Sequence, residues 1–319
     1  MSGWLIFTHG DGDGVASAAL AKAFLDKKGF TTHVIFTHPV GLLGDLKGFL
    51  KEGFNVIILD IALNENYIED ISRILGEVSR RNEVIYIDHH PLLDKAEFGG
   101  NVVFLHVPSK STSELTFNFF HEKGLDVEYS RVAIYGAISD YLDDTTWVKE
   151  MLDTWDKRSV YLEAGILVEG LEGAGKDYDF KRRVVEHLSM NKLPSSLNEL
   201  VDKSLKQAIR NEELRIWVKN NVIIRDNVSY VINPPGSLGR AANYSRIYGN
   251  TKVGIAVETR GETLVMSLRS DRSIDLNKAL REISRKLKVH GGGHPQAAGA
   301  RMDKSMFALF LEELNNHVK

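Results

Sequence analysis

Short apolar runs alternate with longer amphipathic stretches along the N-terminal part of the chain. Five runs are rich in Val, Ile, Leu and Phe, and they lie at 4–7, 33–36, 55–60, 83–88 and 101–106. Continuous runs of this length are typical of strands that are buried on both faces. Between them, residues 15–29, 42–51 and 65–80 carry apolar positions at helical spacing. Because strands and helices alternate, the pattern predicts βαβ units, and therefore a parallel sheet with helices on both faces.

The pattern changes twice in the second half of the chain. Helices are predicted at 131–144, 177–191 and 196–219, with Pro194 between the last two. Residues 222–233 and 252–269 each predict a pair of strands, turning at Asp226–Asn227 and at Arg260–Gly261, and helices follow at 274–287 and 305–316. We therefore expect an α/β fold with a parallel-sheet domain over 1–150, a helical connector over 151–220 and a smaller α/β domain over 221–319.

Composition and charge narrow the chemistry. The 319 residues carry a formal net charge of −3, which argues against a broad basic surface that grips long nucleic acid. A local basic cleft, or a small anionic substrate bound through metal, is compatible with this charge. The sequence has no cysteine, which excludes disulfides, a thiol nucleophile and thiolate metal sites. Any metal must be held by His, Asp or Glu.

The start of the chain, MSGWLIFTHGDGDG, lacks a charged segment followed by a long apolar run, so we expect no signal peptide. No apolar run approaches the roughly 20 residues that a membrane-spanning helix needs. These two observations predict a cytoplasmic protein that does not associate with a membrane.

Acidic residues and histidines follow three of the predicted strands at the point where each strand ends. They are His9, Asp11 and Asp13 after the first strand, Asp60 after the third, and Asp88, His89 and His90 after the fourth. In a parallel sheet, ligands bind outside the carboxyl ends of the strands. If these strands are neighbours, all three ends converge on one edge of the sheet. Asp140, near the end of a later predicted helix, would complete the set.

Several carboxylates in one small space repel one another unless a counter-charge is present, and divalent cations supply that charge. Mixed oxygen and nitrogen ligands suit Mn²⁺, and also Co²⁺ or Zn²⁺, whereas Mg²⁺ prefers oxygen. There are too many candidate ligands for one ion, which favours two, the usual arrangement for attack on phosphorus. The glycines at 10, 12 and 14 let the backbone turn tightly and approach the ions.

Each motif taken singly has a structural interpretation. HGDGDG fits a polar loop, since it lacks both G-x-G-x-x-G and the Walker lysine. Asp60 alone fits a cap or turn residue, DHH a surface cluster, and Asp140 a solvated acid on a helix. The remaining histidines, His106 among them, have no partner at metal spacing and are expected to be structural. Only the combination of motifs at successive strand ends favours a metal centre.

With these motifs the chain resembles the DHH phosphoesterase superfamily, in its DHH–DHHA1 branch. That branch includes RecJ exonucleases, bacterial and archaeal nanoRNases, and cyclic-dinucleotide phosphodiesterases. The matching segments are THGDGDGVASA (8–18), ILDIA (58–62), DHH (88–90), GAISDY (136–141), SLRS (267–270) and GGGHPQAAGA (291–300). The first motif is spaced His-x-Asp-x-Asp, the short form of archaeal and RecJ-like members, where other members have His-x-x-x-Asp-x-Asp.

The resemblance implies a role for each residue of these motifs. One metal would be held by His9, Asp11 and Asp60, and the other by Asp13, Asp60, His89 and Asp140, with Asp60 bridging. Asp88 would orient an imidazole, and His90 and Asp60 would be the catalytic residues. The substrate would be bound by His90, Arg269, Gly291, Gly292, Gly293 and His294, the glycines through a loop that exposes backbone N–H groups.

Two of these segments also have a plainer interpretation. Gly291–Gly293 fits a glycine hinge beside a structural histidine. Ser111 and Glu114 fit a capping box at the start of a helix, although such a helix N-terminus also favours a phosphate.

The expected function is hydrolysis of short oligonucleotides to nucleoside monophosphates by two metals, most readily Mn²⁺, with Co²⁺ or Mg²⁺ as alternatives. The active site is expected in the cleft between the two domains. Alternatives are a 3′-phosphoadenosine 5′-phosphate phosphatase, a cyclic-dinucleotide phosphodiesterase or a short polyphosphatase. A non-catalytic nucleotide-binding scaffold is a further alternative. The expected partner is an oligonucleotide or a small phosphorylated nucleotide, and the sequence leaves a homodimer open.

Overall fold

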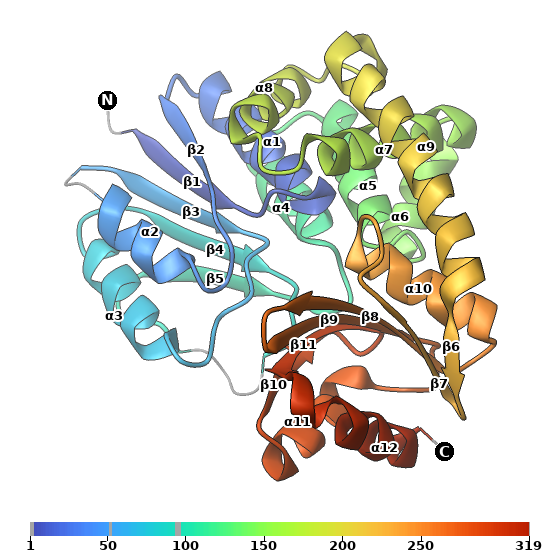
Figure 1. Ribbon diagram of the computed structural model, residues 1–319. Coiled ribbons are helices and arrows are strands. Elements are labelled where there is room, and N and C mark those ends of the chain that lie inside the picture. Colours follow the sequence, from blue (N-terminus) through green and yellow to red (C-terminus); the bar gives the residue numbers. More distant parts are fainter. Residues whose placement is uncertain (1–2, 51–52, 93–96, 319) are drawn as a thin grey trace. The chain divides into compact units, whose positions relative to one another are not determined.

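The computed structural model describes residues 3–50, 53–92 and 97–318, and it contains two sheets, each with its own helices (Figure 1). The last residue of the helix predicted over 42–51, Lys51, lies outside the described residues.

The first sheet has five strands and carries the acidic strand ends. Its strands are β1 (Trp4–Thr8), β2 (Thr32–Phe36), β3 (Asn55–Leu59), β4 (Val84–Asp88) and β5 (Val102–His106). They lie in the order β2-β1-β3-β4-β5, and every neighbouring pair is parallel. The predicted parallel sheet is therefore confirmed. Strands β1, β3 and β4 are direct neighbours, which is the condition that the strand-end argument required.

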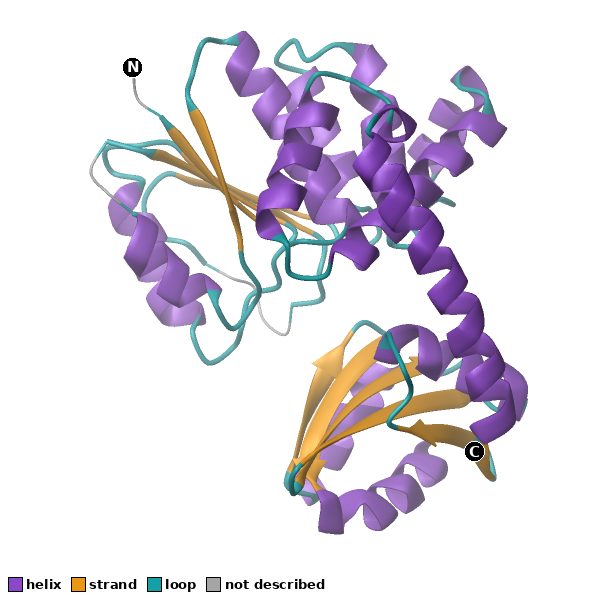
Figure 2. Cartoon of the chain, turned by 45° about the horizontal axis from the view of Figure 1, so that its top comes forward, coloured by secondary structure: helices purple, strands orange, loops and turns teal. Residues whose placement is uncertain are grey.

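Successive side chains of the central strands enter two different cores. Ile6 and Ile57 pack in one core, whereas their chain neighbours Phe7 and Ile58 pack in the other. The first core includes residues of α1 (Gly12–Lys27), α4 (Thr112–His121) and α5 (Ser130–Ser139). The second includes residues of α2 (Leu42–Phe49) and α3 (Ile68–Val78). Helices therefore cover both faces of the sheet, as the apolar strands predicted (Figure 2).

More helices follow α5 in the chain, in agreement with the predicted helical segment. They are α6 (Thr146–Thr154), α7 (Lys157–Ala174), α8 (Tyr178–Ser189) and α9 (Asn198–Asn221). Short 3₁₀ turns lie before α5, at Val127–Tyr129, and between α8 and α9, at Pro194–Ser196. The helix predicted over 131–144 ends earlier, because α5 stops at Ser139 and Tyr141 adopts a left-handed backbone with φ of 58°. Asp140 is thus the residue that caps the end of α5 rather than a residue inside it.

The second sheet is mixed and has six strands in the order β10-β11-β9-β8-β7-β6. The strands are β6 (Ile223–Arg225), β7 (Val228–Ile232), β8 (Val253–Arg260), β9 (Thr263–Ser270), β10 (Val289–Gly293) and β11 (Ala297–Asp303). Both predicted strand pairs are present, with left-handed backbone at Asp226 and Gly261 in their turns. Helices α11 (Leu276–Lys286) and α12 (Phe307–His317) share one core with this sheet, and α10 (Leu238–Gly249) shares another with it.

Two features of the second sheet differ from the prediction. Residues 291–293 form part of strand β10, paired with β11, instead of a loop. Helix α10 was not predicted, because its sequence LGRAANYSRIYG combines two glycines with Asn, Ser and Tyr, which are poor helix formers.

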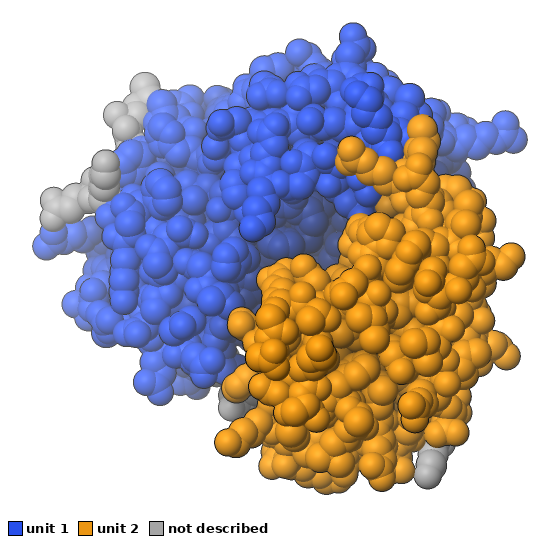
Figure 3. Space-filling view, in the orientation of Figure 1, with its two compact units in different colours: residues 1–207 blue, residues 208–319 orange. Residues whose placement is uncertain are grey.

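The chain divides into two compact units, residues 1–207 and 208–319 (Figure 3). The first contains the parallel sheet and the second the mixed sheet. Within the described ranges, none of the helices combines the length and the apolar character that crossing a membrane requires.

Candidate metal centre

The register of the first sheet places the three motif-bearing strand ends at one edge. Thr8 of β1 is paired with Leu59 of β3, which in turn is paired with Ile87 of β4. The residues that follow these three positions therefore leave the sheet side by side. The edge is where ligands bind in open α/β sheets.

Asp13 lies in the first turn of α1, and the start of another helix holds its carboxylate. Its Oδ2 accepts a hydrogen bond of 2.7 Å from the backbone N–H of Thr112, and its Oδ1 accepts one of 2.9 Å from that of Ser113. Both donors belong to the first turn of α4, where backbone N–H groups have no partner within the helix. The Asp13 side chain is fully buried, so its orientation is fixed.

Asp60 follows β3 and is 2% exposed. Its backbone is left-handed, with φ of 58°, which is uncommon for a residue other than glycine. Oδ1 lies 3.3 Å from the hydroxyl of Thr112 and 3.4 Å from Nε2 of His89. Within the described part of the chain, the buried Oδ2 has no hydrogen-bond partner. A buried carboxylate oxygen without a donor is costly and calls for a ligand.

His89 brings the last of the carboxylates into the same place. Its Nε2 lies 3.3 Å from Oδ2 of Asp140, which follows α5. One ligand atom from each of four residues lies within 4.8 Å of the other three, and we call these residues the second ligand group: Asp13, Asp60, His89 and Asp140. They come from α1, the end of β3, the end of β4 and the end of α5.

A first ligand group shares Asp60 with the second. It consists of His9, Asp11 and Asp60, whose ligand atoms also lie within 4.8 Å of one another. Nδ1 of His9 is 2.6 Å from Oδ2 of Asp11, and these two side chains are 41% and 44% exposed. The other Asp11 oxygen caps α1 by accepting a hydrogen bond of 3.1 Å from the N–H of Gly14. This group is therefore more open to solvent than the second.

Charge in this cluster is not balanced by the protein alone. Burial, with the charge of Asp140, raises the pKa of the Asp13 carboxyl to about 7. Burial and the charges of Asp11 and Asp13 raise the pKa of the Asp60 carboxyl well above its usual range. Burial disfavours a charged His89, but the close carboxylates of Asp140 and Asp60 outweigh it and raise the pKa of the imidazole to about 11.

These raised pKa values mean that the protein alone favours bound protons in this cluster, so added positive charge stabilises it. Carboxylates and imidazoles at this spacing, with an unpartnered buried oxygen on the residue common to both groups, fit divalent cations. The donor set contains both oxygen and nitrogen. It is therefore suited to Mn²⁺ and the other transition metals more than to Ca²⁺.

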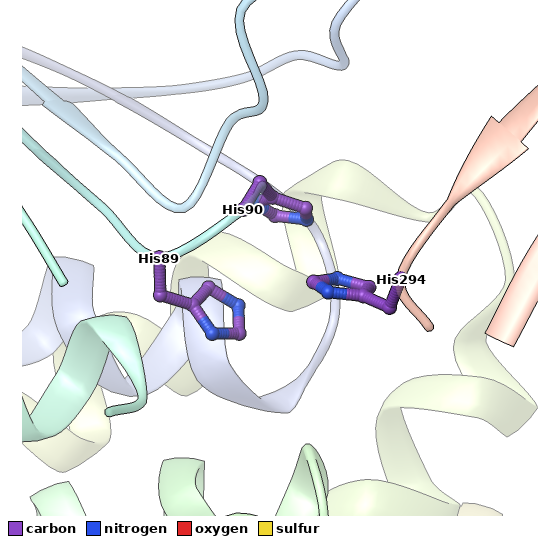
Figure 4. Close-up of side chains that lie close together, drawn as sticks. All are labelled: His89, His90 and His294. Atoms are coloured by element: carbon purple, nitrogen blue, oxygen red, sulfur yellow. The ribbon is translucent and has the colours of Figure 1, made fainter. Parts of the chain in front are cut away.

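His90 is held differently from its neighbour. The rings of His89 and His90 leave the chain in different directions, and their planes are 66° apart (Figure 4). Asp88, which is 1% exposed, accepts hydrogen bonds of 2.7 Å from Nδ1 of His90 and of 3.2 Å from its backbone N–H. Nε2 of His106 on β5 lies 2.6 Å from the His90 carbonyl oxygen. Asp88 thus orients an imidazole, and that imidazole belongs to His90.

The start of α4 is a cap, but not a capping box. Oγ of Ser111 accepts a hydrogen bond from the N–H of Glu114, as predicted. The Glu114 carboxylate does not return to Ser111; it is fully buried and pairs with Nζ of Lys110 at 2.6 Å and with Oγ1 of Thr145 at 2.9 Å. The anion that the helix N-terminus binds is the carboxylate of Asp13. Glu114 thereby ties α4 to the segment that follows Asp140.

The second unit carries the other candidate residues at one end of its sheet. Arg269 of β9 is paired with Ala297 of β11, and β11 is joined to β10 by a tight turn in which the N–H of His294 donates to the Ala297 carbonyl. Gly293, with φ of 147°, is needed in β10 because a Cβ there would lie 2.6 Å from that carbonyl oxygen. Arg269 also lies against the start of α10, where a Cβ on Gly239 would be 2.6 Å from its Nη2. The side chain of His294, the residue whose N–H donates in this turn, is drawn and labelled in Figure 4.

Several residues that build the site were not predicted from the sequence. Thr112 and Ser113 act through backbone N–H groups, which leave no signature in the side-chain pattern. His106 was predicted to be structural, and its hydrogen bond to the His90 main-chain oxygen fits that role. A signal was present for the first two, since the predicted helix start at Ser111 marks where free backbone donors had to lie.

Comparisons with known proteins agree with both halves of the structure. Residues 4–142 match the N-terminal domain of the DHH family, and residues 227–319 match the DHHA1 domain. A search of curated proteins found no match.

Solved structures of low sequence identity share the fold. RecJ from Thermus thermophilus, in complex with Mn²⁺, has a TM-score of 0.68 and 16% identity, and the match covers 99% of this chain and 52% of that one. This chain therefore spans about half of that RecJ. A second exonuclease RecJ, bound to manganese, has a TM-score of 0.63 and 17% identity, with 99% and 89% covered. The pGpG-specific phosphodiesterase PggH from Vibrio cholerae has a TM-score of 0.61 and 14% identity, with 99% and 98% covered.

Proposed function

We propose that this chain, which belongs to the DHH family of metal-dependent phosphoesterases and carries a DHHA1 domain, hydrolyses short oligonucleotides to nucleoside monophosphates. The observation that carries the proposal is the pair of ligand groups that share Asp60. Two metals a few ångströms apart are the usual machinery for displacement at phosphorus. The RecJ proteins of similar fold were solved with Mn²⁺, which supports this metal here.

The protein residues would hold two ions through the two groups described above. Asp60 would bridge them, with His9 and Asp11 on one side and the other three ligands on the second side. When bound, the ions would supply positive charge that activates water and stabilises the phosphoryl oxygens. The backbone donors of α4 keep Asp13 fixed, so the second group is preorganised for its ion.

His90 would contact the substrate. Because Asp88 holds Nδ1 of the ring, we assign Nε2 to a phosphoryl oxygen or to the leaving oxygen. Asp88 fixes both the tautomer and the direction of this ring, as carboxylates do for many functional histidines.

The second unit would bind the nucleotide. Arg269 offers a planar fork of donors that suits a phosphate. The segment from Gly291 to His294 lies at the same end of the mixed sheet as Arg269. A single arginine and one short segment, in a chain with net charge −3, favour a short substrate over long nucleic acid.

A ladder of 5′-labelled oligonucleotides of increasing length, RNA and DNA side by side, tests the proposal. We expect Mn²⁺-dependent release of nucleoside monophosphates, fastest on the shortest members, and no release in EDTA. The Asp60→Asn variant is the negative control, because it removes the shared ligand. Mn²⁺-dependent activity on 3′-phosphoadenosine 5′-phosphate or polyphosphate, with none on any oligonucleotide, would contradict the proposal.

A dinucleotide phosphodiesterase is the second candidate, and the fold shared with PggH favours it. pGpG is itself the shortest oligonucleotide of the ladder, so pGpG and a cyclic dinucleotide belong in the same assay. Cleavage of pGpG alone would assign this narrower activity. A non-catalytic scaffold predicts nucleotide binding that resists EDTA and no hydrolysis of any of these substrates.

A further inference from the structure

Helix α8 reaches the metal-binding loop through one buried cation. Lys181 is 7% exposed, and its Nζ donates a hydrogen bond of 2.5 Å to the carbonyl oxygen of Gly10, a residue 171 positions earlier in the chain. Gly10 lies between the two candidate ligands His9 and Asp11. An ammonium group placed so deeply is costly unless it is hydrogen-bonded or paired, and the Gly10 carbonyl supplies such a bond.

The loop and the helix are closely packed. A Cβ on Gly10 would lie 3.3 Å from Nζ of Lys181 and 3.7 Å from Cε1 of Tyr178. Tyr178 in turn stacks on Phe36 of β2, with ring centroids 5.6 Å apart and planes 17° apart. The start of α8 is thereby fixed against the sheet and against the loop that follows β1.

The Lys181 side chain also lines a cavity of about 310 Å³ in the first unit. Two candidate ligands, Asp11 and Asp140, one from each ligand group, lie in the wall of the same cavity. Lys181 therefore faces the same space as the candidate metal centre, although it belongs to neither ligand group.

The backbone on the N-terminal side of Asp11 has less internal support than the side chain, which caps α1 through the N–H of Gly14. Gly12 is the first residue of α1 and is held by that helix, whereas Gly10 belongs to no helix or strand. A glycine outside regular structure has a wide choice of backbone angles. The hydrogen bond from Lys181 to the Gly10 carbonyl limits that choice, and with it the direction in which Asp11 leaves the chain.

We propose that Lys181 is a positioning residue for the first ligand group, acting through the Gly10 carbonyl. It holds Asp11 and His9 in the orientation that binds the first ion. The second ligand group has its own anchor in the backbone N–H groups of α4 and does not depend on Lys181. This inference rests on the proposed two-metal site.

Titration of the metal-free protein with Mn²⁺, followed by calorimetry and by the electron paramagnetic resonance signal of free Mn²⁺, tests it. In Lys181→Met we expect one of the two binding events to weaken by about 10–100-fold, the range for partners of metal ligands, and the other to stay unchanged. Lys181→Arg, which keeps a charged donor, should recover most of the lost affinity.

Lys22→Met is the matched control. Lys22 also links α1 to α8, through an ion pair of 3.0 Å with Glu186, and it pairs with Asp26 of its own helix at 2.9 Å, but it belongs to neither ligand group. It should keep both Mn²⁺ affinities even where the melting temperature falls. Equal Mn²⁺ binding by wild type and Lys181→Met, or equal weakening of both sites, would overturn the inference.

The outcome separates this inference from the proposed function. A wild-type protein that binds two Mn²⁺ ions but hydrolyses no oligonucleotide contradicts the proposed substrate and leaves the role of Lys181 intact. A wild type that binds no Mn²⁺ overturns both.

Discussion

At the scale of single residues, Asp60 combines three features that destabilise the folded protein. It is buried, its charge is opposed by neighbouring carboxylates, and its backbone is left-handed. Such a backbone conformation costs on the order of 1 kcal/mol or more and persists only where the surrounding structure imposes it. A residue that belongs to both ligand groups can repay these costs only when cations are bound. Among the candidate ligands, Asp60 is therefore the residue where stability and metal binding oppose each other most directly.

Asp60→Asn should separate the two effects. Asparagine has nearly the same shape and tolerates a left-handed backbone, but it carries no charge. Losing a residue that only orients a metal ligand typically costs about 10–100-fold in activity. Asp60→Asn weakens a ligand that both ions would share, so we expect phosphoesterase activity to fall by more than about 100-fold. We also expect the metal-free protein to melt at a higher temperature than wild type. Asp70→Asn on α3 removes the same charge at the surface and should change neither quantity. Unchanged activity in Asp60→Asn would refute the bridging role.

The protonation of the cluster predicts how the metal-free protein responds to pH. Since the pKa of Asp13 is raised to about 7 and that of Asp60 is raised further above its usual value, the folded state holds these protons more tightly than the unfolded chain. Their stabilising contribution is complete below the ordinary carboxyl pKa of about 4 and is lost as pH rises through about 7 for Asp13. His89, with its pKa raised to about 11, acts in the same direction at higher pH.

In EDTA, the melting temperature should therefore fall between about pH 5 and about pH 8. Saturating Mn²⁺ should flatten or reverse this slope, because the ion replaces the protons. Differential scanning calorimetry at matched ionic strength measures both curves. A metal-free melting temperature that rises over this range would show that the carboxylates are not crowded as the structure has them.

At the scale of elements, the site depends on three helices approaching one another closely. The first turn of α4 holds Asp13 of α1, and α5 delivers Asp140 at its end. Small residues permit this approach. A Cβ on Gly12 of α1 would lie 2.5 Å from Cβ of Ser139, so the glycine is needed for contact between α1 and α5.

The strongest prediction of this kind concerns Gly136. A Cβ at this position of α5 would lie 2.3 Å from Oγ of Ser113 and 2.7 Å from Oδ1 of Asp13. Gly136→Ala should therefore lower the free energy of unfolding by about 1–3 kcal/mol through overpacking, and should weaken Mn²⁺ binding as Asp13 is displaced. Chemical denaturation and Mn²⁺ titration measure the two effects.

Gly165→Ala provides the control, because a Cβ there, inside α7, meets nothing within 4 Å. Alanine is the better helix former, so this variant should gain about 0.5–1 kcal/mol of stability and bind Mn²⁺ normally. If Gly136→Ala behaved like Gly165→Ala, the close contact of α4 and α5 at Asp13 would be wrong.

Elements with a clear side-chain pattern could be predicted from the sequence, whereas elements and contacts that depend on the backbone could not. The strands before His9, Asp60 and Asp88 are continuous apolar runs, so both the sheet and the gathering of the candidate ligands at its edge followed from the sequence. Strand β10 was missed because three successive glycines carry no strand preference. The Lys181 contact with Gly10 was missed because two residues so far apart in the chain share no local pattern.

At the scale of the whole molecule, the fold alone does not select the substrate. Chains of similar fold include a RecJ exonuclease and a pGpG-specific phosphodiesterase. The selection must come from particular side chains. In this chain the candidate metal ligands lie in the first unit, whereas the candidate phosphate-binding arginine lies in the second. Chemistry and substrate binding should therefore respond to different mutations.

Arg269→Ala tests that division. A charge-assisted hydrogen bond contributes about 1.5–3 kcal/mol, and a contact kept equally in the ground and transition states affects KM rather than kcat. We expect KM for the best substrate to rise about 10–100-fold with kcat nearly unchanged, while Mn²⁺ affinity stays at the wild-type value. Arg285→Ala, which removes the same charge from the exposed side of α11, should leave both constants alone. Steady-state kinetics in saturating Mn²⁺ measures them, and a loss confined to kcat would place Arg269 in the chemical step instead of in substrate binding.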